Sequence, residues 1–215
     1  MGTKPIGEAL KGTLQERVLK AARLVFLELG FFKANTRAIA SRAGTSESGL
    51  FRLFPGDQGG KYALLMAVYN DCWREVNEIL ARKVTCDATN PKKALVEIIR
   101  NLFALYDQDP ELISLIIINT GNTDTLLIQR RDSAIVTEEN FRYLNRIERL
   151  CESCLKKGVI SGNLSARALA EGLLGISEGV LLGWYLADQS DKSSDPYPAK
   201  ISIREAMKVV EKLLN

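Results

Sequence analysis

Histidine is absent from the 215-residue sequence, and cysteine, methionine and tryptophan are scarce, at four, three and two residues. The absence of histidine excludes histidine-based catalytic triads, histidine-ligated zinc and imidazole acid–base chemistry. Four cysteines in a chain of this length do not form the framework of a secreted disulfide-rich protein, so a reducing cytoplasm is the expected compartment. No apolar run approaches the roughly 18 residues that a membrane span needs, and the N-terminus lacks the apolar core of a signal peptide.

The residue patterns of common catalytic sites are also missing. The sequence contains no glycine-rich phosphate-binding loop and no recognisable pair of nucleophile and base. An enzyme built on a helical bundle would need such clustered groups, so we expect no enzymatic activity, no metal and no cofactor. Cys151 and Cys154 have the spacing of a redox pair, but they lie in the middle of a helical pattern on its apolar face. We therefore interpret them as buried, inert thiols.

Charge is distributed unevenly along the chain. Of the 29 Lys/Arg and 26 Asp/Glu residues, ten and five lie in residues 1–65, which leaves 19 and 21 for the remainder. The N-terminal part therefore has a net charge of +5 and the rest a net charge of −2. A basic head on a near-neutral body is typical of proteins that bind phosphate, although an incidental surface bias would give the same distribution.

Residues 35–54 contain two short helical patterns separated by a single glycine, Gly44. The first pattern spans residues 36–43, and the glycine after it suits a left-handed turn that other residues resist. The second pattern opens at a pair of hydroxyl residues that can cap a helix, and it directs Leu50 and Phe54 inward. Two short helices joined by a tight turn form a helix-turn-helix motif. In such motifs the second helix enters the major groove of DNA and the first lies across the backbone.

This segment and its flanks resemble the tetracycline-repressor (TetR) family of bacterial transcription regulators. An amphipathic helix with a capping box at Thr13 and Glu16 precedes the motif and ends at a glycine. The resemblance covers residues 13–70 and rests on the order of Gly30-Phe31-Phe32, Asn35-Thr36, Ile39-Ala40, Ala43-Gly44, Ser46, Leu50-Phe51, Phe54, Lys61 and Leu64-Leu65. It implies a three-helix DNA-binding head, followed by a domain that binds a small molecule and a second subunit.

The resemblance also implies which head residues contact DNA. Thr36 and Arg37 would face phosphate at the start of the first motif helix, and Arg52 would reach backbone phosphate. Residues at the start of the second helix would reach base edges, although ordinary helix capping explains Ser46 equally well. The complete set of expected DNA contacts is Thr36, Arg37, Thr45, Ser46, Glu47, Ser48, Phe51, Arg52 and Lys61.

Three positions depart from the family pattern. Phe51 stands where the family often has tyrosine, so a phenolic hydroxyl to phosphate is missing. Glu47 and Ser48 stand where the family often has a basic residue or glycine. The carboxylate of Glu47 would repel phosphate but could accept a hydrogen bond from a cytosine amine. Residues 55–60 form a longer link to the next helix than is usual in the family, which leaves the position of Lys61 open.

Beyond the motif the sequence predicts helices only. They cover residues 61–84, a stretch from 91 to the next start signal at 109, residues 110–118, a long pattern ending at 157, residues 163–187 and residues 203–213, with loop chemistry at 119–125 and 188–200. The expected fold is therefore all-α with about nine helices. A flexible arm (residues 1–12) precedes a helix-turn-helix domain (13–70), and a helical-bundle domain for ligand binding and dimerisation follows (71–215).

Four glycines form one stripe on the helix expected at residues 163–187: Gly172, Gly175, Gly179 and Gly183. Each glycine inside a helix costs about 0.5–1 kcal/mol relative to alanine, so four of them need a compensating interaction. A bare stripe lets another helix approach closely, and a helix this apolar must be buried. We expect the same helix of a second subunit to pack there, as the resemblance implies for the last two helices. Packing within one chain would also explain the stripe.

These features predict a cytoplasmic, ligand-responsive transcription regulator. The favoured form is a repressor that binds a palindromic operator as a homodimer, with its recognition helices about 34–36 Å apart, and is released by a small apolar effector. The candidate pocket residues are Trp73, Phe103, Tyr106, Asn119 and Tyr143. Aromatic residues at helical spacing more often belong to a core than to a pocket. Two alternatives remain open: a helical protein-binding adaptor that needs neither Arg37 nor Arg52, and a transcriptional activator without a small-molecule ligand.

Overall fold

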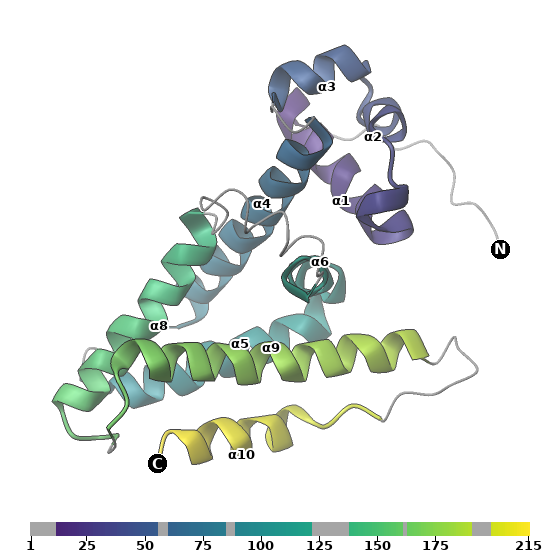
Figure 1. Ribbon diagram of the computed structural model, residues 1–215. Helices are drawn as coiled ribbons and strands as arrows, with labels where there is room; N and C mark the ends of the chain where they lie inside the picture. The colour runs from purple at the N-terminus through teal and green to yellow at the C-terminus, as the bar shows by residue number, and fades with distance from the viewer. Residues whose placement is uncertain (1–11, 56–59, 85–88, 122–137, 161–162, 191–198) are drawn as a thin grey trace. The chain divides into compact units, whose positions relative to one another are not determined.

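The computed structural model describes residues 12–55, 60–84, 89–121, 138–160, 163–190 and 199–215, with the backbone alone described for residues 118–121. Every regular element within these residues is an α-helix, which confirms the predicted all-α class (Figure 1). The nine helices of the described part are α1 (Leu14–Lys33), α2 (Thr36–Ala43), α3 (Glu47–Leu53), α4 (Gly60–Lys83), α5 (Pro91–Gln108), α6 (Pro110–Gly121), α8 (Glu138–Lys156), α9 (Ala166–Ser190) and α10 (Ile203–Leu213).

The chain divides into two compact units, and the division falls after Asp71. The first unit, the head, holds α1, α2, α3 and the first half of α4, while the second unit, the body, holds the rest of α4 and helices α5 to α10. Helix α4 thus contributes residues to both units. The predicted arm lies outside the described residues up to position 11, as do residues 56–59 of the predicted insertion and residues 122–125 of the predicted loop.

Helix α1 begins with the predicted capping box. The Thr13 hydroxyl accepts the backbone N–H of Glu16 at 3.3 Å, and the Glu16 carboxylate accepts the backbone N–H of Thr13 at 2.8 Å. The helix buries its apolar face against α2. Gly30 interrupts the helical backbone with φ 72° and ψ 162°, as expected for a stop at this glycine, but helical residues resume after it and continue to Lys33.

Two caps and one glycine define the helix-turn-helix. The Asn35 side-chain oxygen accepts the backbone N–H of Ala38 at 2.7 Å and begins α2. Gly44 follows α2 with φ 69° and ψ 42°, which is the left-handed conformation predicted for it. The Ser46 hydroxyl accepts the backbone N–H of Gly49 at 3.1 Å and begins α3. Local sequence alone therefore determines both helix starts and the turn between them.

Helix α3 is anchored to the head by two apolar side chains. Leu50 is fully buried and Phe54 is 6% exposed, which confirms both as core residues. Gly60, at the start of α4, lies close to Phe51 and Phe54 of this segment. A Cβ at Gly60 would collide with the Phe51 ring and would lie 2.9 Å from the Phe54 carbonyl oxygen, so the backbone can approach α3 this closely only because the residue is glycine.

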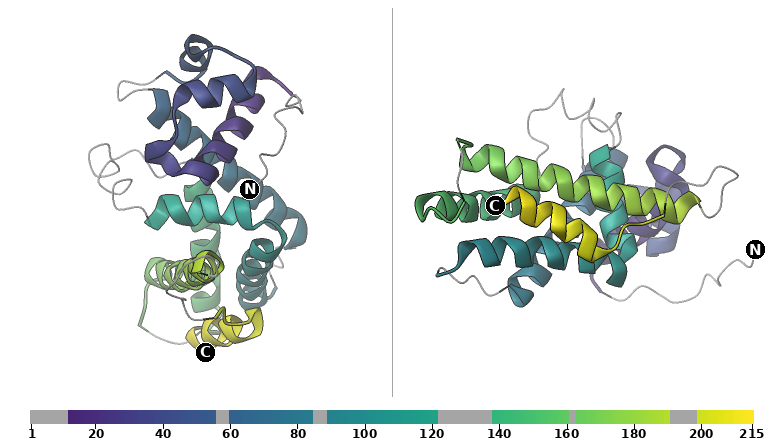
Figure 2. Two further views of the ribbon diagram at one scale, coloured as in Figure 1. Left: turned by 90° about the vertical axis from the view of Figure 1, so that its right-hand side faces the viewer. Right: turned by 90° about the horizontal axis from the view of Figure 1, so that it is seen from below.

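Helix α5 runs through the centre of the body. Its start matches the prediction, because the Asn90 side-chain oxygen accepts the backbone N–H of Lys93 at 3.0 Å and Pro91 occupies the first turn. Helix α5 packs against α6, α8, α9 and α10, and the views agree that α10 lies beside α9 (Figure 2). The body core includes Leu95, Ile98, Ile99, Leu102, Phe103, Leu112, Ile147 and Leu173, all nearly inaccessible to solvent.

A buried hydroxyl and an ion pair hold the segment that leads into α10. The Tyr106 hydroxyl donates to the Asp188 carboxylate at 2.9 Å, and the Lys200 ammonium lies 2.6 Å from the same carboxylate and 4.9 Å from the Tyr106 ring centroid. Burial, reinforced by the hydrogen bond to Asp188, raises the pKa of Tyr106, so the phenol stays a donor. Ser202 and Glu205 then form the second predicted capping box.

Two helix ends differ from the predictions. Helix α6 continues to Gly121, although the sequence predicted a loop from Asn119, and α9 continues to Ser190 instead of ending near Ala187. Asparagine and threonine cost less than about 1 kcal/mol each in a helix, so a helix already formed by an apolar segment extends through them. Helix α8 ends at Lys156, and Gly158 follows with φ 64°, as the predicted stop requires.

Candidate functional site

Helix α3 has one side that is exposed to solvent. Ser48 and Arg52 are exposed and the Phe51 side chain is 40% exposed, whereas Leu50 on the opposite side is fully buried. Arg37, near the start of α2, is exposed as well. The head therefore offers hydroxyl, guanidinium and aromatic groups on two short helices that are themselves held by their buried sides.

Two of the expected DNA contacts bind each other. The Thr36 hydroxyl donates to the Glu47 carboxylate at 2.6 Å, and both residues are half-buried. This hydrogen bond joins the first turn of α2 to the first turn of α3. A carboxylate in the first turn of a helix is favoured by the helix dipole, but it also places a negative charge beside the side chains that would face phosphate.

Ser46 acts as the cap of α3. Its hydroxyl accepts the backbone N–H of Gly49 and lies 2.9 Å from the Ser48 hydroxyl. Thr45, just before it, is half-buried. Of the hydroxyls expected at base edges, the Ser46 hydroxyl is therefore already engaged, and contacts from Thr45, Ser46 and Ser48 to DNA stay a prediction.

Lys61 is engaged within the head. Its ammonium donates to the Phe32 carbonyl oxygen at 3.1 Å and lies 4.6 Å from the centroid of the Phe31 ring. Partial burial lowers the pKa of Lys61. A cation beside the last carbonyls of α1 complements the negative end of that helix. A contact from Lys61 to phosphate also stays a prediction, and it would have to coexist with these two interactions or replace them.

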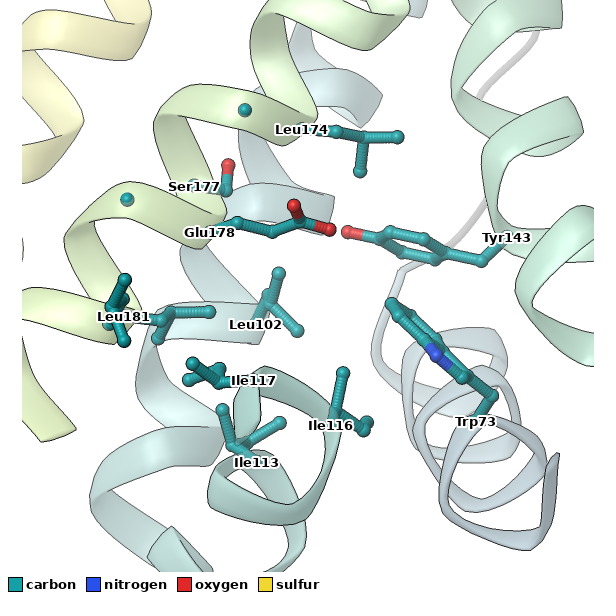
Figure 3. A pocket seen from close by; sticks show the side chains of 13 residues that line it. Trp73, Leu102, Ile113, Ile116, Ile117, Tyr143, Leu174, Ser177, Glu178 and Leu181 are labelled. Carbon is teal, nitrogen blue, oxygen red and sulfur yellow. The ribbon is translucent and has the colours of Figure 1, made fainter. Parts of the chain in front are cut away.

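The body contains a cavity of about 260 Å³ between α4, α5, α6, α8 and α9 (Figure 3). This volume lies near the lower end of the range of about 300–1,000 Å³ typical of small-molecule sites. Most of the wall is aliphatic or aromatic. The lining residues are Trp73, Leu102, Ile113, Ile116, Ile117, Tyr143, Leu174, Gly175, Ser177, Glu178, Gly179, Leu181 and Leu182.

Two polar side chains meet inside this cavity. The Tyr143 hydroxyl points toward the Glu178 carboxylate, and the Tyr143 ring packs on Trp73 with 4.9 Å between the ring centroids (Figure 3). Tyr143 is 1% exposed, and its hydroxyl has no hydrogen-bond partner among the described residues. Burial raises the pKa of both Tyr143 and Glu178, and the nearby Glu178 charge adds to the rise at Tyr143.

The four predicted glycines lie on one side of α9, and we call them the glycine stripe: Gly172, Gly175, Gly179 and Gly183. A Cβ added at Gly175, Gly179 or Gly183 would meet no described atom within 4 Å, and at Gly172 it would meet only the Leu213 side chain, at 4.0 Å. Beside the stripe, Leu182 and Leu186 are each 37% exposed. The stripe and its neighbouring leucines therefore form an apolar surface that no other described part of the chain covers.

Residues 18–68 match the sequence model of the family "Bacterial regulatory proteins, tetR family". The head of the chain is therefore similar to that of TetR-family regulatory proteins. The match falls inside residues 13–70, which the sequence analysis assigned to the head, and it confirms the resemblance stated there. It also supports the interpretation of this part of the chain as belonging to a transcription regulator. No curated protein matches the chain significantly in sequence.

Solved structures of transcription regulators share the fold of this chain over nearly its whole length. SmeT, the repressor of the Stenotrophomonas maltophilia multidrug efflux pump SmeDEF, is 21% identical, with a TM-score of 0.68 over 96% of this chain and 91% of SmeT. The transcriptional regulator FadR from Bacillus subtilis, in complex with stearoyl-CoA, is 20% identical, with a TM-score of 0.65 over 93% and 97% of the two chains.

A TetR-like transcriptional regulator from Rhodococcus sp. RHA1 is 18% identical, with a TM-score of 0.59 over 96% of each chain. At identities this low, the structural similarity establishes a common fold only. Ligands and partners have to be argued from the residues of each chain.

The cavity of the body includes two of the five predicted pocket residues. Trp73 and Tyr143 line it, whereas Phe103 and Tyr106 lie elsewhere. Phe103 and Tyr106 pack on Trp184, with ring centroids 5.4 and 5.6 Å apart, and form part of the core. The side chain of Asn119 lies outside the described part of the structure.

Sequence reasoning missed Glu178 and the aliphatic residues of α6 as parts of the cavity. Glu178 did carry a signal, because it is the sole charged residue between Glu171 and Asp188 in a very apolar helix. A lone carboxylate that is buried with such a helix costs free energy unless it has a partner, so its presence indicates a partner or a function. The residues of α6 carried no such signal, since isoleucine in a core and isoleucine in a cavity wall look the same in a sequence.

The two cysteines on α8 have the environment expected of inert thiols. Cys151 and Cys154 are both free and buried. Burial raises the pKa of the Cys151 thiol to about 12, and burial raises the pKa of Cys154 as well. Neutral thiols are poor nucleophiles, so neither cysteine has the features of a reactive redox group.

The Glu47→Gln variant is expected to bind DNA more tightly than the wild-type regulator. The substitution removes a negative charge from the first turn of α3 and weakens the hydrogen bond that holds the Thr36 hydroxyl. A unit charge near phosphate in a partly solvated site is worth about 1 kcal/mol, so we expect an increase of about 3- to 10-fold at low salt that shrinks at high salt. Gel shifts at two salt concentrations measure it.

Glu111→Gln provides the matched control for this comparison, because it removes the same charge from an exposed position of the body. It should leave DNA affinity unchanged. Weaker binding by Glu47→Gln would contradict the electrostatic prediction and would indicate that the carboxylate accepts a hydrogen bond from a base.

Proposed function

We propose that this chain is a TetR-family transcription regulator, a dimeric repressor whose two heads bind a palindromic operator and whose body releases the DNA when a small effector enters the cavity. The observation that carries the proposal is the exposed side of α3 on a family-matched head, with Arg37 and Arg52 free to reach solvent. The net charge of +5 in residues 1–65 supports it, because phosphate contacts dominate the affinity of such proteins for DNA.

The glycine stripe supports the dimer. The stripe and its flanking leucines form an uncovered apolar surface on α9. Helix α10 packs against α9, and its Val209 is 49% exposed. In a C2 dimer the same surface appears on both subunits, so one stripe can pack against its own copy. Close approach of two backbones would offset the helix propensity lost at four glycines.

Helix α4 supports coupling between effector and DNA. It is continuous from Gly60 to Lys83, and it carries Trp73 into the cavity wall in its second half while its first half belongs to the head. An effector that binds one conformation of the body better than another shifts the population toward that conformation. A shift that displaces α4 would change the spacing of the two heads and release the operator.

The proposed compartment is the cytoplasm, where an operator is accessible. Among the described residues, α9 is the one helix long and apolar enough to cross a membrane by length and composition, a test that core helices of soluble proteins also pass. Only 33% of its most apolar window is buried within one chain. A second subunit on the glycine stripe would supply the missing cover.

Replacing both exposed arginines of the head tests DNA binding. Wild-type protein should bind duplex DNA from beside its own gene, with an affinity that falls steeply as salt rises. Arg37→Ala combined with Arg52→Ala should weaken binding by at least about 10-fold and make the slope of log K against log salt less negative by about 2, because each phosphate contact contributes about 0.9. Gel shifts or fluorescence anisotropy across salt concentrations give both quantities.

The matched control is Arg149→Ala combined with Arg204→Ala, which removes two exposed arginines from the body. This pair should leave both the affinity and the salt slope unchanged. An unchanged slope in the head variant would reject the assignment of Arg37 and Arg52 to phosphate. Failure of the wild-type protein to bind any duplex at low salt would favour the adaptor alternative.

A further inference from the structure

Among the described residues, the lining of the cavity in the body is mostly apolar. Side chains of α5 and α6, including Leu102, Ile113 and Ile116, form its aliphatic part (Figure 3). Ser177 adds a hydroxyl, but that hydroxyl already donates to the Leu173 carbonyl oxygen at 2.7 Å. The side-chain oxygen atoms that remain open to a ligand are therefore concentrated where Tyr143 of α8 and Glu178 of α9 face each other.

Neither of these two groups is satisfied within the described part of the chain. The Tyr143 hydroxyl is buried and has no hydrogen-bond partner. Glu178 is half-buried and makes no hydrogen bond or ion pair with any described residue. Arg146 is close enough to lower the pKa of Tyr143, but its guanidinium donates to the Val84 carbonyl oxygen at 3.4 Å. Glu178 thus has no counter-cation among the side chains that the structure describes around the cavity.

The charge of Glu178 discriminates among classes of ligand. A wholly apolar ligand would displace water from an unpaired carboxylate and an unpaired hydroxyl, which is costly. A ligand that ends in a carboxylate or phosphate would meet like-charge repulsion in a poorly solvated site. A ligand that ends in an amine would donate charge-assisted hydrogen bonds to Glu178 and could donate to the Tyr143 oxygen as well.

The aromatic pair favours the same class of ligand. Trp73 and Tyr143 pack with their ring centroids 4.9 Å apart and an angle of 34° between their planes, beside the carboxylate. Ring faces attract organic cations, and tryptophan attracts them most strongly. An aromatic pair next to an unpaired carboxylate in an aliphatic cavity is therefore complementary to a positive charge carried on an apolar body.

We propose that the effector is a small lipophilic amine, with its apolar body against the aliphatic wall and its ammonium group between Glu178 and Tyr143. That the amine acts as an effector rests on the proposed function. That the amine binds does not, because the binding site lies wholly in the body. The inference also refines the expectation of a small apolar effector, because it adds one positively charged group to the apolar body. The cavity volume of about 260 Å³ restricts the ligand to a compact molecule of a few rings.

A matched set of probes tests the proposal on the full-length protein without DNA. The probes are naphthylmethylamine, naphthylmethanol and naphthoate, which share an apolar body and carry a positive, neutral and negative group. Calorimetric titration should give an affinity for the amine at least about 10-fold higher than for the alcohol, since one charge-assisted hydrogen bond gives about that factor. Binding of the carboxylate should be weaker than binding of the alcohol.

Two variants locate the preference. Glu178→Gln should abolish the preference for the amine over the alcohol, and Tyr143→Phe should reduce it about 3-fold while binding of the alcohol persists. Glu171→Gln, on the same helix but outside the cavity, should keep the wild-type preference. Circular dichroism checks folding, and Glu178→Gln should be at least as stable as wild type because it removes an unpaired carboxylate from a poorly solvated site.

The results separate this inference from the proposed function. Equal binding of the three probes to wild type, or a preference retained in Glu178→Gln, would overturn the amine site whatever the protein does with DNA. Preferential binding of the amine, lost in Glu178→Gln, would support it. Operator binding measured separately then decides whether the amine also releases DNA, and a regulator that binds DNA but shows no preference for the amine leaves the proposed function standing alone.

Discussion

In the Gly183→Leu variant, the dimer is expected to dissociate at least about 30-fold more readily than the wild-type dimer, and operator binding should fall with it. In the proposed dimer, a leucine at this position would stand between two closely packed helices. Overpacking costs about 1–3 kcal/mol per inserted side chain, and the C2 axis inserts two, so the total is about 2–6 kcal/mol. A monomer contacts only one half of a palindromic operator, which removes most of the affinity.

The same substitution should not harm the single chain. A Cβ at Gly183 meets no described atom within 4 Å, and leucine is a better helix former than glycine by nearly 1 kcal/mol. Gly183 also lies outside the cavity lining, so the substitution leaves the contacts between a probe and the cavity wall in place. The unfolding free energy of the monomer should therefore stay constant or rise while the dimer weakens, a combination that general destabilisation cannot produce.

Analytical ultracentrifugation over a range of protein concentrations measures the dissociation constant, and Ala81→Leu is the matched control. Ala81 is exposed on α4, outside the glycine stripe, so the same increase in size should leave the dimer intact. A Gly183→Leu protein that dimerises and binds operator like wild type would show that the stripe is not the dimer surface.

Leu50→Ala is expected to unfold the helix-turn-helix and abolish operator binding. Leu50 is fully buried on α3, and replacing a buried leucine by alanine costs about 2–5 kcal/mol. A small three-helix head has little stability in reserve, so a loss of this size removes much of it. The body core is untouched, and binding of the amine probe should be unchanged.

Leu53→Ala makes the identical chemical change on the same helix at a side chain that is 36% exposed. It should cost about 1 kcal/mol or less and leave operator binding measurable. Thermal unfolding followed by circular dichroism, together with gel shifts, compares the two variants. Full operator affinity in Leu50→Ala would mean that α3 does not depend on its buried anchor.

Helix boundaries that depend on local chemistry could be predicted from the sequence. The capping boxes at Thr13 and Ser202 and the left-handed Gly44 involve residues three or four positions apart, so their signals are complete within a short window. The end of α6 could not be predicted in this way. Its last turn contains polar residues that suit a loop, and a helix already formed by apolar residues outweighs that weak local preference.

The pairing of distant side chains could not be predicted from the sequence. Thr36 and Glu47 were each expected to contact DNA, and nothing in a one-dimensional pattern indicated that they bind each other across the turn. Glu178 and Tyr143 lie on different helices, and the angle and rotation between those helices decide that they meet. Family resemblance could not supply this pairing either, because the match covers only residues 18–68.

Two glycines of the stripe, Gly175 and Gly179, also belong to the cavity wall. A molecule inside the cavity and a second copy of the chain packed on the stripe would therefore both contact the same two turns of backbone. Thermodynamic linkage makes any coupling between the two events reciprocal. If the amine changes the dimerisation constant by some factor, dimerisation changes the affinity for the amine by the same factor. The dimer dissociation constant would then report whether the cavity is occupied, in a measurement that needs no DNA.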